Sequence, residues 1–255
     1  GSKSHEEITE EYDNVFLRRY GDDEELQKVI SPEYGNGRQM RLYQWCYEKM
    51  AEGFDWVAFI DVDEFVMFEE GWSLNRLCKT FEDVPAVHLY WKMKGASGHI
   101  KRPTCGVMEA YTEDAPFVST DARGWNSKSL INLKKGMGMR TCHHAVGGVR
   151  TDGTEGIEPV YDKAWLNHYF SKSWEDWCDR IYKRGDVYRG NRTLAQFFEA
   201  NPSMEHLREE LIASVAERIP NGTHWLDKKR GLIAGGNLKK IMELNTKCNE
   251  NSNPR

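Results

Sequence analysis

The stretch Phe54-Asp-Trp-Val-Ala-Phe-Ile-Asp-Val-Asp-Glu-Phe65 predicts both the fold class and the place of the functional site. Its apolar run 57–60 is short and flanked by polar residues, as is typical of a strand covered on both faces. Because side chains alternate along a strand, we expect Asp61 and Asp63 to point the same way and Val62 the opposite way. Ligands of open α/β sheets gather at the carboxyl ends of strands. The stretch therefore predicts an α/β domain with a ligand site at this strand end.

The chemistry of the acidic pair favours a metal. Two carboxylates on one face of a strand end can share a hard divalent cation such as Mn²⁺ or Mg²⁺. The alternative for any D-x-D triplet is a solvated strand end. The apolar run before Asp61 and the abrupt acidic stop favour the metal site.

Size and charge exclude several classes of protein. The 255 residues suffice for one large α/β domain, or for a domain with a smaller appendage. A net charge of −5 argues against a nucleic-acid partner, which usually requires a basic surface. No run approaches the roughly 18 apolar residues of a membrane span, and no signal peptide is evident. We therefore expect a chain with no membrane span and no nucleic acid.

The cysteines are scattered and contain no C-x-x-C pair. This spacing argues against a zinc ribbon and favours free thiols over disulfides. The compartment is open, with the cytoplasm favoured slightly over the Golgi lumen, because a cytosolic enzyme and an excised lumenal domain would share these sequence features. The six cysteines are Cys46, Cys78, Cys105, Cys142, Cys178 and Cys248.

Hydrophobic periodicity outlines the remaining elements. Helices are predicted over 6–20, 38–52, 73–78, 193–200 and 203–218, and strands over 86–91, 129–133 and 142–146. Ser173-Trp-Glu-Asp176 fits a capping box and predicts the start of an amphipathic helix. We expect two domains: residues 1–190, carrying the site, and a helical extension over 191–255 packed on it.

A second group of polar residues lies about a hundred positions after the acidic pair. In Trp165-Leu-Asn-His-Tyr-Phe-Ser-Lys172, His168 is a candidate third metal ligand and Lys172 a candidate phosphate partner. The basic cluster around Arg189 is a candidate loop for binding a diphosphate. The alternatives are a core histidine for His168 and a solvated helix end for the cluster.

Three motifs, taken in order, resemble those of a known group of enzymes. They are Trp56 to Phe65 (W-x-x-x-h-D-x-D-E-F), Gly95-Ala-Ser-Gly-His99 (G-x-x-G-H) and Asn167-His-Tyr-Phe-Ser-Lys-Ser173 (N-H-Y-x-x-K-S). Over roughly residues 30–190 the chain resembles glycosyltransferases of the GT-A fold, in the family 2-like and family 92-like group. The resemblance implies a Rossmann-like mixed sheet flanked by helices, with a helical C-terminal part. The first βα strand of that fold is not visible in this sequence.

The resemblance also implies a donor and a metal. The donor is a nucleoside-diphosphate sugar, with a UDP-sugar favoured, and the metal is Mn²⁺ or Mg²⁺. Asp61, Asp63 and His168 are the implied metal ligands. Lys172 and Arg189, together with Asp61, are the implied contacts to the donor diphosphate.

Inversion at the anomeric carbon is implied as well, by direct attack of a hydroxyl on a glycan or other acceptor. Such an attack needs a general base near the acceptor. The candidates are Glu109, Asp121 and His99, with Glu109 favoured because a carboxylate is the usual choice. Among the nine tryptophans, Trp91 and Trp125 are the candidate platforms for stacking a sugar.

Two other classes of function stay open. A phosphohydrolase of the haloacid dehalogenase type also places D-x-D after an apolar strand. Those enzymes carry a small hydroxyl residue where Phe65 stands, and Gly185-Asp186 lacks the second acid of their downstream motif. The other class is an inactive, carbohydrate-binding relative of a transferase, which the tryptophan content fits.

Overall fold

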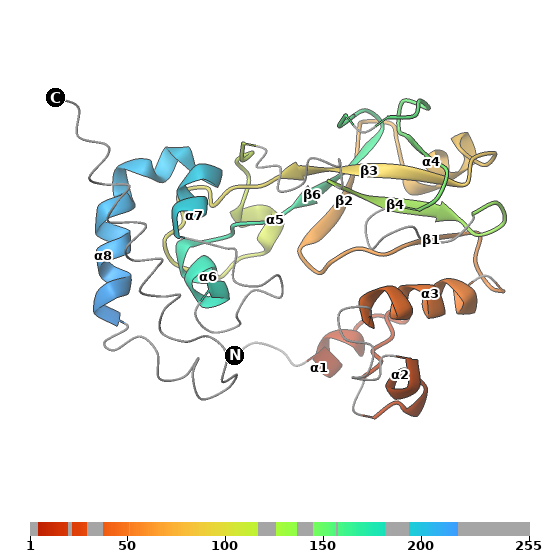
Figure 1. The fold of residues 1–255 in the computed structure, drawn as a ribbon, viewed down its shortest axis with the longest axis horizontal. Helices are drawn as coiled ribbons and strands as arrows, with labels where there is room; N and C mark the ends of the chain where they lie inside the picture. Colours follow the sequence, from red (N-terminus) through yellow and green to blue (C-terminus); the bar gives the residue numbers. More distant parts are fainter. Residues whose placement is uncertain are drawn as a thin grey trace. The chain divides into compact units, whose positions relative to one another are not determined.

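The structure, a computed structural model, describes residues 5–19, 22–29, 38–50, 52–116, 126–136, 145–156, 158–181 and 194–218. It is a mixed α/β protein, as predicted (Figure 1). The helices are α1 His5–Thr9, α2 Glu24–Val29, α3 Arg38–Met50, α4 Leu74–Thr80, α5 Val107–Ala110, α6 Trp174–Asp179, α7 Leu194–Ala200, the 3₁₀ helix η3 Pro202–Leu207 and α8 Arg208–Arg218. None of these described helices is long and apolar enough to cross a bilayer.

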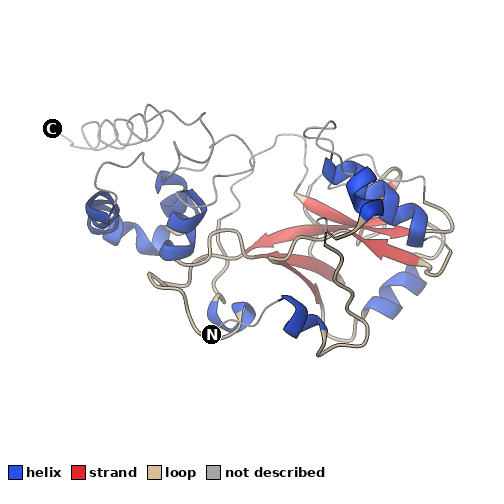
Figure 2. Ribbon diagram, turned by 90° about the horizontal axis from the view of Figure 1, so that it is seen from below, coloured by secondary structure: helices blue, strands red, loops and turns tan. Residues whose placement is uncertain are grey.

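Six strands form one mixed sheet (red in Figure 2). They are β1 Trp56–Ala58, β2 Glu64–Phe68, β3 Ala86–Met93, β4 Ser127–Asn132, β5 Gly148–Arg150 and β6 Ala164–His168. The order is β1-β4-β3-β6-β2, and β5 pairs with β3. β4 runs antiparallel to both β1 and β3, whereas β5 runs parallel to β3. This pairing is compatible with the predicted mixed sheet.

The chain divides into two compact units. Unit 1 comprises residues 1–61, 66–90 and 121–166, and unit 2 comprises 62–65, 91–120 and 167–255. The division predicted at residue 190 stays a prediction. Each unit has its own apolar core, so each is described separately.

The core of unit 1 lies between the sheet and α3. Ala86 and Ile131 are fully buried, and Tyr47 of α3 packs against them. Tyr43, one turn earlier on α3, stacks on Phe59 with ring centroids 4.5 Å apart. The predicted helix over 38–52 is thus confirmed, and its aromatic stripe faces the core as the helical period requires.

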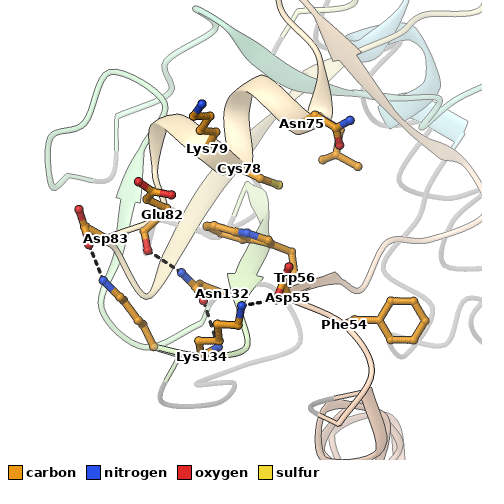
Figure 3. A pocket seen from close by; sticks show the side chains of 12 residues that line it. Phe54, Asp55, Trp56, Asn75, Cys78, Lys79, Glu82, Asp83, Asn132 and Lys134 are labelled. Carbon is orange, nitrogen blue, oxygen red and sulfur yellow. Dashed lines mark hydrogen bonds and ion pairs between the residues drawn. The ribbon is translucent and has the colours of Figure 1, made fainter.

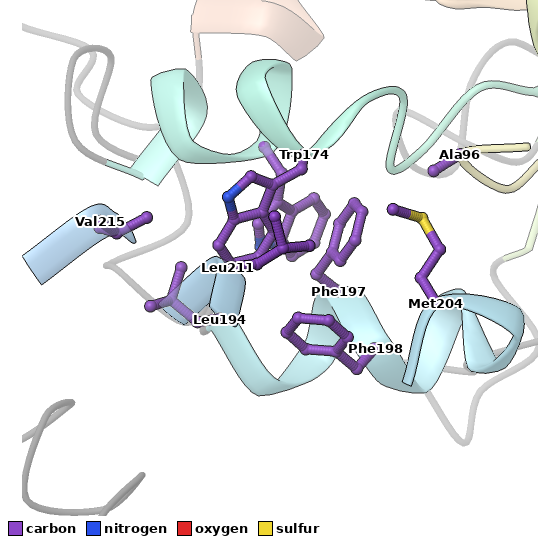
Figure 4. Close-up of a cluster of buried hydrophobic side chains, with 9 residues drawn as sticks. Ala96, Trp174, Leu194, Phe197, Phe198, Met204, Leu211 and Val215 are labelled. Carbon is purple, nitrogen blue, oxygen red and sulfur yellow. The ribbon is translucent and has the colours of Figure 1, made fainter. Parts of the chain in front are cut away.

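The core of unit 2 is aromatic. Trp174 and Trp177 of α6 pack against Phe197 and Phe198 of α7, with ring centroids 5.0 Å apart for Trp174 and Phe197 (Figure 4). The predicted cap at Ser173 is confirmed, because its Oγ accepts a hydrogen bond from the Asp176 backbone N–H at 3.1 Å. A capped α6 presents both indoles to α7.

Two local predictions differ from the structure, and a third falls mostly outside the described residues. The helix predicted over 6–20 ends at Thr9, and Phe16 is 85% exposed, so no core rewards a longer amphipathic helix. The strand before the acidic pair ends at Ala58, and residues 62 and 63 form a turn. Of the strand predicted over 142–146, residues 142–144 lie outside the described part, and the nearby strand β5 begins at Gly148.

Candidate functional site

Asp61, in unit 1, is held by a lysine from the neighbouring strand. Its Oδ2 accepts a hydrogen bond from Lys128 Nζ at 3.0 Å. The side chain of Lys128 is only 1% exposed, whereas that of Asp61 is 45% exposed. A buried ammonium needs a charged or polar partner, since burial without one is costly. Lys128 of β4 therefore fixes the carboxylate of Asp61 while leaving one side of it open.

Asp63, in unit 2, is turned into the protein. Its neighbour Val62 is 99% exposed, whereas Asp63 is only 9% exposed. The backbone carbonyl of Asp63 accepts a hydrogen bond from the Tyr169 N–H at 2.9 Å. Asp63 is therefore anchored to the chain that follows β6. The continuous strand on which the predicted alternation rests is absent, because β1 ends at Ala58 and residues 62 and 63 form a turn.

A guanidinium binds the carboxylate of Asp63. Arg180 Nη2 donates to Asp63 Oδ2 at 2.5 Å, and Arg180 Nη1 donates to the Phe170 carbonyl at 2.7 Å. The two side chains are 22% and 13% exposed, so the ion pair is largely shielded from water. Charge-assisted hydrogen bonds of this kind are the strong ones.

The electrostatics around Asp63 favour its ionised form. Burial raises the pKa of the Asp63 carboxyl, but the positive charges of His168 and Arg180, with that of Lys172, outweigh burial. The pKa consequently lies below its ordinary value. Asp63 is thus an ionised carboxylate surrounded by basic groups at neutral pH.

His168 ends β6 and is held between two aromatic rings. Its ring centroid lies 4.6 Å from that of Trp91 and 5.9 Å from that of Phe170. Its backbone carbonyl accepts a hydrogen bond from the Lys94 N–H at 2.9 Å. These contacts restrict the orientation of the imidazole beside Asp63. They also place Trp91, a predicted sugar platform, against His168.

Two loops of unit 2 carry unusual backbone conformations. Lys172 has a φ of 53°, and Ser97 and Gly98 have φ values of 49° and 75°. Left-handed residues other than glycine are uncommon and often mark functional sites. At Gly95 a Cβ atom would lie 2.9 Å from Asn201 Oδ1, which accepts a hydrogen bond from the Ala96 N–H at 2.5 Å. A larger residue at this position would require the side chain of Asn201, and its hydrogen bond to Ala96, to shift.

The predicted general bases have different surroundings. His99 Nε2 lies 3.0 Å from the Ala110 carbonyl, and because a carbonyl only accepts, Nε2 carries the proton. Glu109 lies on α5 with an exposed side chain. Asp121, together with Arg189 and Trp125, lies outside the described residues. The roles of all three bases stay predictions.

The predicted ligands can be compared with what a metal requires. Asp63 and His168 lie together, and a carboxylate with an imidazole suits Mn²⁺. Within the described residues, no group of three or more His, Cys, Asp or Glu could hold a metal ion. Mg²⁺ at nucleotide sites is usually held by one or two carboxylates plus substrate phosphates, so a small protein set suffices there. A metal held by Asp63, His168 and donor phosphates therefore stays a prediction.

Sequence reasoning missed two residues of these sites, Lys128 and Arg180. Lys128 interrupts the run Ser127 to Ile131, of which every residue is buried, and a lysine within such a strand is a usable signal. Arg180 follows α6 and reaches Asp63 across 117 positions of sequence. Nothing near Arg180 in the sequence indicates that partner.

Comparison with known proteins assigns the family. A sequence model of glycosyltransferase family 92 matches residues 5–218. The chain belongs to glycosyltransferase family 92. A family 92 protein of Oryza sativa subsp. japonica is 23% identical over 199 residues, which are 68% of this chain and 31% of that protein. The chain thus spans about a third of the length of this curated family 92 relative. The resemblance predicted from three motifs is confirmed at the level of the family.

The four cysteines of this family 92 chain that the structure describes, Cys46, Cys78, Cys105 and Cys178, are free thiols. This agrees with the prediction for those four.

Proposed function

We propose that this family 92 chain transfers a sugar from a nucleoside-diphosphate donor to a hydroxyl of a glycan or other acceptor. A UDP-sugar is the proposed donor. The observation that carries the proposal is the setting of Asp63: an ionised, largely buried carboxylate beside His168, with Arg180 and Lys172 around it. This arrangement suits a ligand that carries both negative oxygens and a divalent cation.

The basic groups have a direct part in this reaction. Sugar transfer breaks the bond between the anomeric carbon and the diphosphate, and negative charge develops on the departing oxygen. Lys172 and Arg180 supply positive charge next to Asp63, and Arg binds phosphate oxygens with good geometry. Arg189 is proposed for the same role from its sequence position. These groups would lower the free energy of the leaving diphosphate.

The proposed metal is Mn²⁺ or Mg²⁺, which neutralises charge on a leaving diphosphate when bound. Asp63 and His168 would hold it, and Asp61 is the proposed third ligand from its place in the sequence. Arg180, which donates to Asp63 Oδ2 at 2.5 Å, would supply positive charge for the phosphate oxygens of the donor.

Inversion requires a base on the acceptor side. The acceptor oxygen forms a bond to the anomeric carbon as the carbon–phosphate oxygen bond breaks, and the hydroxyl proton passes to the base. We propose Glu109, since its carboxylate is exposed, whereas the Nε2–H of His99 is directed to the Ala110 carbonyl. Asp121 stays the sequence-based alternative.

The test is calorimetric titration of UDP and GDP into the protein, with Mn²⁺ and with EDTA. We expect the nucleotide to bind only with Mn²⁺ present. Asp63→Asn and His168→Ala should each weaken this binding at least tenfold, which is roughly the loss of one hydrogen bond to a charged group. Asp162→Asn is the matched control, since Asp162 is also paired with a basic side chain, Lys163, but lies in unit 1. A donor screen that measures released nucleotide then identifies the sugar.

Two results would separate the competing functions. Binding of sugars without any response to nucleotide or Mn²⁺ would replace the transferase by the carbohydrate-binding alternative. A phosphatase reaction on simple phosphate esters would favour the haloacid dehalogenase type, which family 92 membership leaves without support.

A further inference from the structure

A concave site lies in unit 1, at the opposite end of β1 from Asp61. It is a depression of about 710 Å³ between the chain entering β1, helix α4 and the end of β4 (Figure 3). This volume falls within the usual range of small-molecule sites, roughly 300–1,000 Å³. Trp56, which lines it, is the first residue of β1, whereas Asp61 lies beyond the last. The depression is therefore separate from the contact between Asp61 and Lys128.

Aromatic surface is available in this depression. Phe54 is 61% exposed, and the indole of Trp56 is only partly buried (Figure 3). Leu74, at the start of α4, is 48% exposed on the same lining. Large apolar side chains grouped in a concavity and left in contact with water mark a binding surface more often than isolated ones do.

The charged groups around this surface cancel. Lys134 Nζ lies 2.5 Å from Asp55 Oδ1, and Lys135 Nζ lies 2.5 Å from Asp83 Oδ1. The charged lining residues are three lysines and three acids: Lys79, Lys134, Lys135, Asp55, Glu82 and Asp83. A neutral lining with alternating signs gives little attraction to a phosphate, a nucleotide or a polyanion. It favours a neutral ligand that can both donate and accept hydrogen bonds.

Two polar side chains of the lining have no partner within the described residues. Asn75 and Lys79 are four positions apart on α4, and so share one face of the helix. Neither makes a hydrogen bond or ion pair with another described residue. Asn132, by contrast, already has a partner at each polar atom, because Nδ2 donates to the Glu82 carbonyl and Oδ1 accepts from the Lys134 N–H. Asn75 and Lys79 are thus the groups available to a ligand.

We propose that this depression binds a neutral oligosaccharide. A pyranose presents an apolar C–H face, which suits Trp56 and Phe54, and a rim of hydroxyls that both donate and accept. Asn75 and Lys79 bind sugar hydroxyls at one side of the depression. In each ion pair, the carboxylate can accept a hydrogen bond from one hydroxyl, and the ammonium can donate to the neighbouring hydroxyl. Trp56 is thus the proposed sugar platform of unit 1, and the predictions for Trp91, in unit 2, and Trp125 stay predictions. This binding requires neither nucleotide nor metal, so it stands apart from the transfer reaction.

The test uses the whole protein and a panel of neutral oligosaccharides of hexoses and N-acetylhexosamines, with sulfated and uronic-acid analogues beside them. Saturation-transfer NMR detects binding, and calorimetry measures affinity. The double variant Asn75→Ala/Lys79→Ala and the single variant Phe54→Ala change exposed or unpartnered side chains, so the fold is retained. Lys28→Ala, an exposed lysine on α2, is the matched control.

We expect a neutral oligosaccharide to bind, and the double variant and Phe54→Ala each to weaken it roughly tenfold, as loss of one or two ligand contacts would. Lys28→Ala and Asp63→Asn should leave this affinity unchanged. The proposal is overturned if no oligosaccharide binds the wild-type protein at about 10 mM, a concentration that would detect even a dissociation constant of about 1 mM. It is equally overturned by a preference for the anionic analogues, or by binding that Asp63→Asn abolishes and the depression variants do not.

Discussion

Arg180→Met removes the guanidinium that holds Asp63 and keeps a long, flexible side chain in its place. The substitution deletes two hydrogen bonds, one to Asp63 Oδ2 at 2.5 Å and one to the Phe170 carbonyl at 2.7 Å. It leaves Asp63 ionised within a partly shielded site. The protein should therefore lose stability at neutral pH while keeping its fold.

The magnitude follows from burial. Removing one partner of a fully buried ion pair costs about 3–5 kcal/mol, whereas an exposed pair contributes about 0.2–1 kcal/mol. The side chains of Arg180 and Asp63 are 22% and 13% exposed, so this pair is largely but not fully buried. Solvent screening places the expected loss between those limits, at about 2 kcal/mol at pH 7.

The loss should depend on pH in a definite direction. The folded-state pKa of Asp63 is lowered, so its contribution is fully present above the unfolded value of about 3.9 and disappears as pH falls through the folded-state pKa. Without Arg180 the folded-state pKa rises. The stability difference between wild type and Arg180→Met should consequently shrink as the pH falls below about 4.

Urea unfolding at several pH values, followed by far-UV circular dichroism and by tryptophan fluorescence, measures these differences. Asp63→Asn and the double variant complete a double-mutant cycle, for which we expect a coupling of about 1–2 kcal/mol at pH 7. Arg180→Lys is the control that keeps the charge and should recover part of the loss. A stability loss that is the same at every pH and additive with Asp63→Asn would refute the ion-pair account.

Three further outcomes are expected. Burial raises the pKa of the Tyr111 hydroxyl to about 12. The contribution of Tyr111 to stability should therefore be complete below the unfolded-state pKa of about 10 and should fade as the pH rises toward 12. Ultraviolet titration of Tyr111→Phe should lack the phenolate step seen near that pH in the wild type. Asn201→Ala removes the amide that binds Ala96 and should cost about 2 kcal/mol in thermal unfolding, and a change below about 0.5 kcal/mol would contradict this. Lys128→Met should change the free energy of unfolding in urea by less than about 1 kcal/mol, because water can solvate the half-exposed carboxylate of Asp61. A larger loss would show that the sheet depends on Lys128.

Local signals in the sequence predicted local structure well. The helix over 38–52 and the cap at Ser173 are confirmed, because helical period and capping act between residues a few positions apart. The helix over 6–20 was overestimated, since periodicity predicts a helix only where a core receives its apolar face. The same reasoning failed beyond Ala58, where a turn replaces the extrapolated strand.

The candidate site was predictable only in part. Asp63 and His168 could be linked from the order of the motifs, and His168 is one of the groups that lower the pKa of Asp63. Their basic neighbour Arg180 could not be predicted, because its pairing depends on how the end of α6 packs against the turn. Lys128 could be suspected from its strand, but not its choice of Asp61. Long-range charge pairing leaves little trace in a single sequence.

The two aspartates that the motif reading assigns to a cation each have a basic partner supplied by the chain itself, Lys128 for Asp61 and Arg180 for Asp63. Repulsion between uncompensated acids is thereby avoided without any ion from outside. The fold around the two carboxylates therefore needs no divalent ion for its charge balance. If the proposed cation binds, removing it with a chelator should leave the protein folded, and adding it back should restore binding.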